Sequence, residues 1–193
     1  PDARRVFLLR RDPPGRGVLG EIVDAVTGAV QCTLEDPVLL GERAEGWFSP
    51  DGHTLLTIHA GTGVLWNAGS GAIVGRLESD RHGLHAPRWV GGDEQILCAS
   101  HSGPLYLFAR SAYPEWRALS VPPQGRDPIH VFATSPDGTR AAVLFARAGE
   151  AAPMLLIDTA NGRAIARLFE RATVSCHAAF SPALSPSKHS TGS

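Results

Sequence analysis

The sequence predicts an all-β protein in which a four-stranded antiparallel unit occurs about four times. Two turn motifs that recur along the chain, and the strand-length apolar strings between them, support this prediction. The 193 residues include 21 Gly and 15 Pro, which indicates many turns and short elements. No segment carries a long apolar stripe at helical spacing, so we expect strands throughout.

The first motif is an apolar residue, then Asp or Asn, three residues, Gly, and six residues that end in Leu. Its anchors are Asp24, Asn67 and Asp158, and Ala109 holds the same position in a weaker copy without the acid and the glycine. The anchors recur about every 42 residues, with an insertion around residues 146–152 in the last interval. A period of this length is typical of the blades of a β-propeller.

The second motif, Ser-Pro-Asp-Gly, occurs twice, two periods apart. Proline presets φ, the Asp side chain bonds to nearby backbone, and glycine adopts a positive φ. The motif therefore predicts structural turns, at Ser49, Pro50, Asp51 and Gly52 and again at Ser135, Pro136, Asp137 and Gly138.

The strings between the turns place the blades, whose strands we name a to d in chain order. The blade units extend over residues 4–36, 44–78, 86–121 and 129–170, and the first strand of a next blade lies within 174–182. The blades thus occupy residues 1–182, and the Ser-rich tail 183–193 is predicted to be disordered.

The chain resembles the WD40 and TolB-like group of β-propellers. The resemblance rests on FSPDG (48–52) after strand a, on LWN (65–67) at the end of strand c, and on the trailing Ser-Gly and Leu. It covers nearly all of residues 4–182. Only Trp66 holds the family's tryptophan position, and Ala60 stands where the family has Asp. We therefore expect the buried polar network of typical WD40 blades to be absent.

The strand count allows two architectures. The last strand could complete the first blade and close a ring of four, or the blades could form an open arc of a larger ring. The arc is favoured because blades of this group form rings of usually about six to eight. An arc leaves two apolar blade faces exposed at its ends.

Composition argues against several partners and compartments. The net charge is −1, and no block of like charge points to nucleic acid or to an anionic membrane. No apolar run approaches the ~20 residues of a membrane span. The cysteines Cys32, Cys98 and Cys176 are far apart and form no CxxC, which favours core thiols and a cytoplasmic setting.

The motifs of common enzymes are missing from the sequence. There is no G-x-S-x-G and no phosphate-binding loop, so we expect no enzyme activity and no cofactor. Eight His make a metal site the best remaining chemical alternative, yet no tight spacing fixes their geometry and we predict none. The Asp/Gly-rich turns could suggest calcium, but turn geometry explains them.

The remaining candidates lie in the d–a and b–c loops, which share one end of a propeller. These loops carry Arg and His that no turn rule demands, and rigid scaffolds commonly place binding residues on such loops. The predicted partner-binding residues are His59, Arg81, His82, His85, His101, Arg126 and Arg147. Aromatic residues at the ends of the a strands are expected to pack between blades: Trp47, Phe48, Trp89, Phe132 and Phe180.

These observations favour a non-catalytic scaffold that binds a protein or peptide. One alternative is the propeller portion of a larger enzyme, a hydrolase or a kinase, whose catalytic residues lie outside this chain. The other is a propeller that binds a small ligand or a metal.

Overall fold

A computed structural model describes residues 4–11, 18–34, 44–78, 83–90, 94–100, 105–109, 116–119, 129–135, 137–145 and 151–172. This part of the chain contains 15 strands and no helix. The strands are β1 (Arg5–Arg11), β2 (Val18–Asp24), β3 (Val30–Thr33), β4 (Glu45–Phe48), β5 (Thr54–His59), β6 (Thr62–Asn67), β7 (Ile73–Leu77), β8 (Leu84–Val90), β9 (Gln95–Ser100), β10 (Leu105–Ala109), β11 (Trp116–Leu119), β12 (Ile129–Thr134), β13 (Arg140–Phe145), β14 (Ala152–Asp158) and β15 (Ala164–Ala172).

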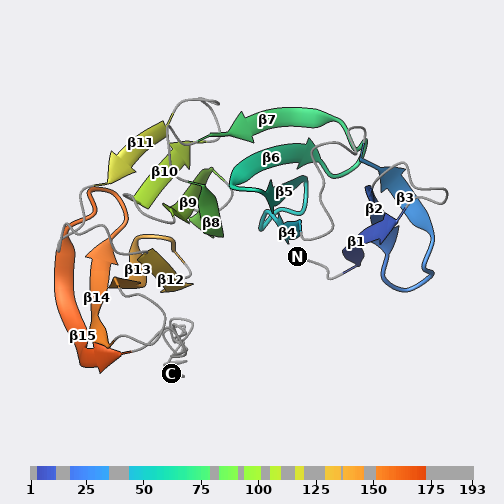
Figure 1. Cartoon of the computed structure of the whole chain (residues 1–193). Coiled ribbons are helices and arrows are strands. Elements are labelled where there is room, and N and C mark those ends of the chain that lie inside the picture. The colour runs from blue at the N-terminus through green and yellow to red at the C-terminus, as the bar shows by residue number, and fades with distance from the viewer. Residues whose placement is uncertain are drawn as a thin grey trace, which may run out of the picture.

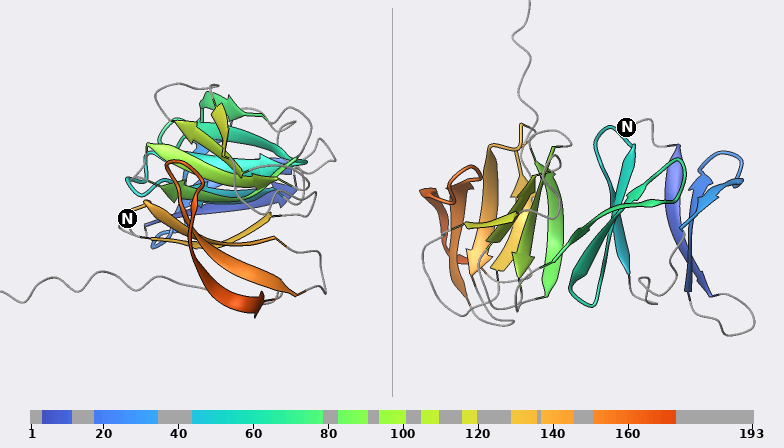
Figure 2. Two further views of the ribbon diagram at one scale, coloured as in Figure 1. Left: turned by 90° about the vertical axis from the view of Figure 1, so that its left-hand side faces the viewer. Right: turned by 90° about the horizontal axis from the view of Figure 1, so that it is seen from above.

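The strands form four antiparallel sheets, each a simple up-and-down meander. Blade 1 is β1-β2-β3, blade 2 is β4-β5-β6-β7, blade 3 is β8-β9-β10-β11, and blade 4 is β12-β13-β14-β15. The blades follow one another around an open arc, with β4, β8 and β12 on its inner side (Figure 1). Seen from above, they stand side by side (Figure 2). The predicted all-β fold of four-stranded blades in an arc is confirmed, while 174–182 and 183–193 lie outside the described residues.

Three hydrophobic clusters fill the three junctions between successive blades. Leu55 belongs to the cluster shared with blade 1, whereas its neighbour Leu56 belongs to the cluster shared with blade 3. Successive strand residues point to opposite faces, so the central strands of a blade bury both faces. Leu97 and Val143 contribute to the third cluster, between blades 3 and 4.

The c–d connection has the same geometry in blades 1, 2 and 4, where it joins β2 to β3, β6 to β7 and β14 to β15. The anchor side-chain oxygen accepts the N–H two residues on, from Val26 to Asp24 (2.9 Å), from Gly69 to Asn67 (2.9 Å) and from Ala160 to Asp158 (2.8 Å). The glycine four residues after each anchor has a φ of 71° to 76°. Beside each turn, a residue pairs with the one seven positions later: Val23 with Val30, Trp66 with Ile73, and Ile157 with Ala164. The sequence repeat therefore corresponds to a repeated turn with an adjoining β-bulge.

The two Ser-Pro-Asp-Gly motifs also form matching turns, except that Pro136 lies outside the described residues. The Oγ of Ser49 accepts the N–H of Thr54 at 2.9 Å, and the Oγ of Ser135 accepts that of Arg140 at 3.0 Å. Each hydroxyl donates to the Asp two residues later. Gly52 has a φ of 73° and Gly138 one of 69°.

Part of a buried polar network is present in blade 2, contrary to the expectation from sequence. The indole Nε1 of Trp66 donates to the Oγ1 of Thr57 at 2.8 Å, and both residues are buried. A buried indole N–H needs a partner, and strand b supplies it without the Asp that Ala60 replaces. Trp47 and Trp89 pack against the cluster between blades 2 and 3, as expected for blade packing.

Candidate binding groove at one end of the blades

Hydrogen bonds show which loops lie together at each of the two opposite ends of the blades. At one end, which we call the turn end, the a–b and c–d turns meet. There the N–H of Ala68 donates to the carbonyl of His53 at 2.9 Å, and that of Thr159 to the carbonyl of Thr139 at 3.0 Å. At the other end, the b–c turn of blade 2 meets the start of blade 3, where the N–H of Leu84 donates to the carbonyl of Gly61 at 2.9 Å.

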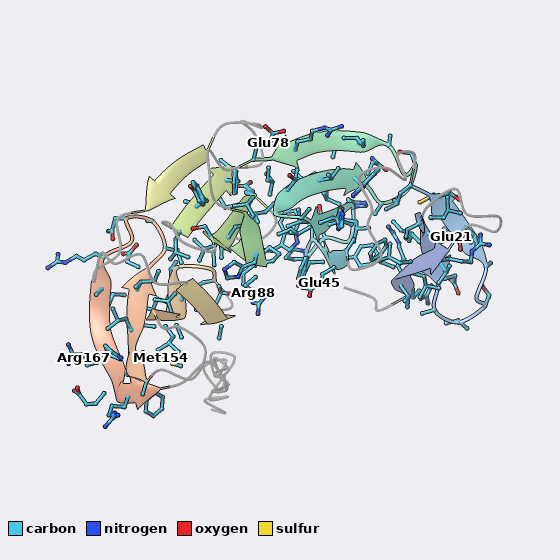
Figure 3. All side chains as sticks on the ribbon, in the orientation of Figure 1. Glu21, Glu45, Glu78, Arg88, Met154 and Arg167 are labelled. Carbon is cyan, nitrogen blue, oxygen red and sulfur yellow. The ribbon has the colours of Figure 1, made fainter. Side chains whose placement is uncertain are left out.

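This second end, which we call the groove end, carries a groove of about 310 Å³ between blades 2 and 3. Strands β4 and β5 and the following turn form one side, and the start of β8 forms the other. The lining residues are Glu45, Trp47, Ile58, Ala60, Gly61, Gly83, Leu84, His85 and Ala86. Figure 3 shows Glu45 on the inner side of the arc, beside β4.

Strand register explains which side chains face blade 3. Glu45 pairs with Ile58, and Trp47 pairs with Leu56. Paired residues share one face of a sheet, and Leu56 and Ile58 belong to the cluster between blades 2 and 3. Glu45, Trp47 and Ile58 therefore lie on the blade 2 face toward blade 3. The intervening Gly46 faces blade 1, because a Cβ there would lie 2.5 Å from the ring of Phe7.

Unfavourable backbone conformations gather at the groove. Ala60 has a φ of 50° and Ala86 a φ of 46°, and they are the only described residues other than glycine with a positive φ. Such conformations cost roughly 1–2 kcal/mol for an L-residue. Ala86 lies in a bulge of β8, between the pairs His85–Ala99 and Arg88–Leu97. Strain of this kind concentrates at functional sites.

Two glycines, Gly61 of blade 2 and Gly83 before blade 3, approach each other closely at the groove. A Cβ on Gly61 would lie 2.4 Å from the Cα of Gly83. Only glycine permits this contact, and the hydrogen bond from Leu84 to Gly61 fixes it. The two blades are therefore joined by backbone at the groove.

Two of the predicted partner-binding residues are described, and only one lines the groove. His59 pairs with Thr62 at the end of β5 and alternates with Ile58, so it lies on the face toward blade 1. His85 pairs with Ala99, which belongs to the cluster shared with blade 4. The Nε2 atom of His85 is buried. The two imidazoles thus share the groove end but not a blade face, and their role in partner binding stays a prediction.

The other predicted residues lie outside the described residues: Arg81, His82, His101, Arg126 and Arg147. Sequence reasoning missed Glu45, Ile58 and Leu84, and it treated Trp47 only as a packing residue. The Ala60-Gly61 turn could have pointed to this groove, because a two-residue hairpin loop requires positive φ, which is unfavourable for Ala60.

The described part of the chain offers little to bind a metal. No group of three or more His, Cys, Asp or Glu within it is arranged to hold an ion. Cys98 is fully buried, and burial raises the pKa of its thiol well above the usual range. Burial also raises the pKa of the Cys32 thiol.

No helix in the described residues is long and apolar enough to cross a membrane.

No protein-family model matches the chain, and no curated protein matches it. Solved structures do match. The β-propeller domain of Cps50 (Swd1) from Myceliophteria thermophila aligns with a TM-score of 0.65 and 16% identity, over 86% of this chain and 52% of that one. The fold is that of a WD40-like β-propeller. The C-terminal WD40 domain of Sif2 aligns with a TM-score of 0.57 and 17% identity, over 81% of this chain and 41% of that one.

A third match to this WD40-like propeller comes from an enzyme. Hydrazine synthase of Kuenenia stuttgartiensis aligns with a TM-score of 0.63 and 15% identity, over 89% of this chain and 47% of that one. The chain spans about half the length of the structures it matches, or less. At these identities the likeness concerns the fold alone.

Proposed function

We propose that this WD40-like propeller is a non-catalytic interaction module that binds a protein or peptide at its groove end. The observation that supports this is the groove between blades 2 and 3. At this groove the backbone is strained at Ala60 and Ala86, and Gly61 contacts Gly83. Blade packing alone would require neither feature. Rigid scaffolds that present shaped surfaces of this kind commonly serve recognition.

The composition of the loops supports the same end of the molecule. The turns described at the turn end are short, and the side chains of Asp24, Asn67 and Asp158 in them accept hydrogen bonds from nearby backbone. The groove-end loops carry the Arg and His residues predicted from sequence, including Arg81 and Arg126. We place the module in the cytoplasm, where its core thiols would stay reduced.

The main alternative is that the chain is the propeller portion of an enzyme. The likeness to a hydrazine synthase chain supports only the shared fold. Reading the neighbouring coding sequence for a G-x-S-x-G or a kinase signature distinguishes this alternative from a scaffold.

The test is affinity capture with three forms of the chain as bait. The double variant Arg81→Glu/Arg126→Glu reverses two charges at the predicted groove end. The matched variant Ser70→Lys/Asn161→Lys changes two exposed residues of the turn end. We expect a partner captured by the unmodified chain to be lost with the first variant and retained with the second. The reverse pattern would move the site to the turn end and overturn the proposal.

A further inference from the structure

The groove between blades 2 and 3 combines three kinds of surface. Ile58, which is 8% exposed, supplies the edge of an apolar wall, Trp47 supplies a partly buried aromatic ring, and Glu45 supplies an exposed carboxylate. A long aliphatic stem that ends in a positive charge matches all three. The stem covers the apolar wall, while the cation is attracted to the carboxylate and to the ring.

The size of the groove suits one side chain. Its volume of about 310 Å³ lies at the lower limit of the roughly 300–1,000 Å³ of small-molecule sites. A nucleotide or a flavin would need more space. An arginine or lysine side chain, held by a backbone that stays outside, fits the available volume.

The charge balance on the described walls also favours a cation. Glu45 is the only carboxylate among the lining residues. Arg88 of β8 pairs with Leu97, on the face toward blade 4, and its guanidinium donates to the carbonyl of Pro87 at 2.8 Å. His85 lines the groove as well, although its register with Ala99 places it on the β8 face toward blade 4. Among the lining residues, Glu45 is therefore the one carboxylate, His85 is the one titratable base, and none is a lysine or an arginine.

We propose that this groove binds an arginine or lysine side chain of a partner polypeptide. The inference rests on the proposed function and deepens it, since it names the chemistry of the partner at one site. Glu45 pairs with the cation, Trp47 stacks on it, and the accessible edge of Ile58 contacts the aliphatic stem.

The experiment titrates the ¹⁵N-labelled chain with acetyl-Gly-Arg-Gly-amide, its lysine analogue and the neutral citrulline analogue. We expect saturable shifts at the amides of Gly61, Gly83 and Leu84 and at the Trp47 indole. Citrulline keeps the shape of arginine without its charge, so it should bind at least fivefold more weakly. Comparison at low and high salt checks that the difference is electrostatic.

A matched pair of variants locates the charge. Glu45→Gln should weaken binding of the arginine probe about fivefold, the upper range for an exposed ion pair, and leave citrulline binding unchanged. Glu94→Gln removes an exposed carboxylate that does not line the groove, and it should leave the affinity for both probes unchanged. Urea unfolding checks that both variants are folded.

Equal affinity for arginine and citrulline in the unmodified chain would overturn the inference without any variant. An unchanged affinity in Glu45→Gln, or shifts confined to other blades, would overturn it as well. If the probes fail while partner capture still depends on Arg81 and Arg126, only this inference falls. If capture also ignores those arginines, the proposed function falls with it.

Discussion

Gly52 and Gly71 have similar backbone conformations, with φ values of 73° and 76°, but different surroundings. A Cβ added at Gly52 would meet no atom within 4 Å. A Cβ added at Gly71 would lie 2.1 Å from the carbonyl oxygen of Thr33, which belongs to blade 1. The first glycine is thus required by its turn alone, and the second also by the contact between two blades.

This difference predicts unequal costs for the same substitution. Gly52→Ala should lower the free energy of unfolding by about 1 kcal/mol, through backbone strain alone. Gly71→Ala should lower it by about 3 kcal/mol, because the backbone of blade 1 must also move. Urea unfolding followed by tryptophan fluorescence measures both. Equal losses would show that the Gly71 contact does not constrain the junction.

Asp137 predicts a local effect of pH. The Ser135 hydroxyl, followed by the backbone N–H and the hydroxyl of Thr139, lowers the pKa of this exposed carboxyl to about 2. Its unfolded-state pKa is near 3.8, so the stabilisation is present above about pH 4 and is lost as the pH falls toward 2. We expect Ser135→Ala to raise the pKa of Asp137, measured by NMR titration.

Asp24 is the internal control for this titration. Backbone N–H groups of Thr27 and Val26 lower the pKa of its carboxyl, and Ser135 plays no part. Its pKa should therefore stay the same in Ser135→Ala. A pKa of Asp137 that is also unchanged would mean that the hydroxyl does not hold the carboxylate.

At the scale of single elements, the c–d turn shows why much of the blade could be predicted from sequence. Asp or Asn at the anchor and Gly four residues later specify a complete turn by local hydrogen bonds and one positive φ. The turn needs no contact with residues distant in the sequence, so the motif and its adjoining bulge recur in blades 1, 2 and 4. The bulge in β8 could not be predicted in the same way, because no such motif marks His85–Arg88.

The b–c turn of blade 2 offers a stabilising change. His59 pairs with Thr62, so Ala60 and Gly61 form a two-residue hairpin loop in which both φ values are positive. Such type I′ loops prefer Asn-Gly. Ala60→Asn should therefore raise the free energy of unfolding by about 1 kcal/mol, because Asn tolerates this conformation better than Ala. Urea unfolding of this variant, with Ala68→Asn as a buried control that should destabilise, tests the assignment.

At the scale of the whole molecule, the groove depends on contacts that no single motif encodes. Glu45 and Leu84 come from different blades and meet only when those blades pack. The sequence placed His59 and His85 together because both lie at one end of the blades. Strand register then assigns them to different faces, a detail that depends on pairing within each sheet.

The outward faces of the two terminal blades carry both exposed and buried apolar side chains. On blade 1, Val6 and Leu8 lie on the face away from blade 2, where they are 40% and 45% exposed. On blade 4, Leu144 and Met154 face away from blade 3 yet are 0% and 1% exposed. Phe169 of β15 pairs with Met154 and is 60% exposed, so exposed apolar side chains are described on the outward faces of both blade 1 and blade 4.

These exposed side chains predict that the isolated chain binds a hydrophobic dye and self-associates, and that β1 contributes to both. Leu8→Lys should reduce both, and the new ammonium would lie opposite Glu21, its partner in β2. Val26→Lys is the matched control, because Val26 is 83% exposed in the c–d turn. Dye fluorescence and light scattering at several concentrations give the readout. Leu9→Lys should instead destabilise the chain, since Leu9 packs against the cluster between blades 1 and 2. Equal dye binding by Leu8→Lys and the unmodified chain would show that the outward face of blade 1 does not contribute to dye binding.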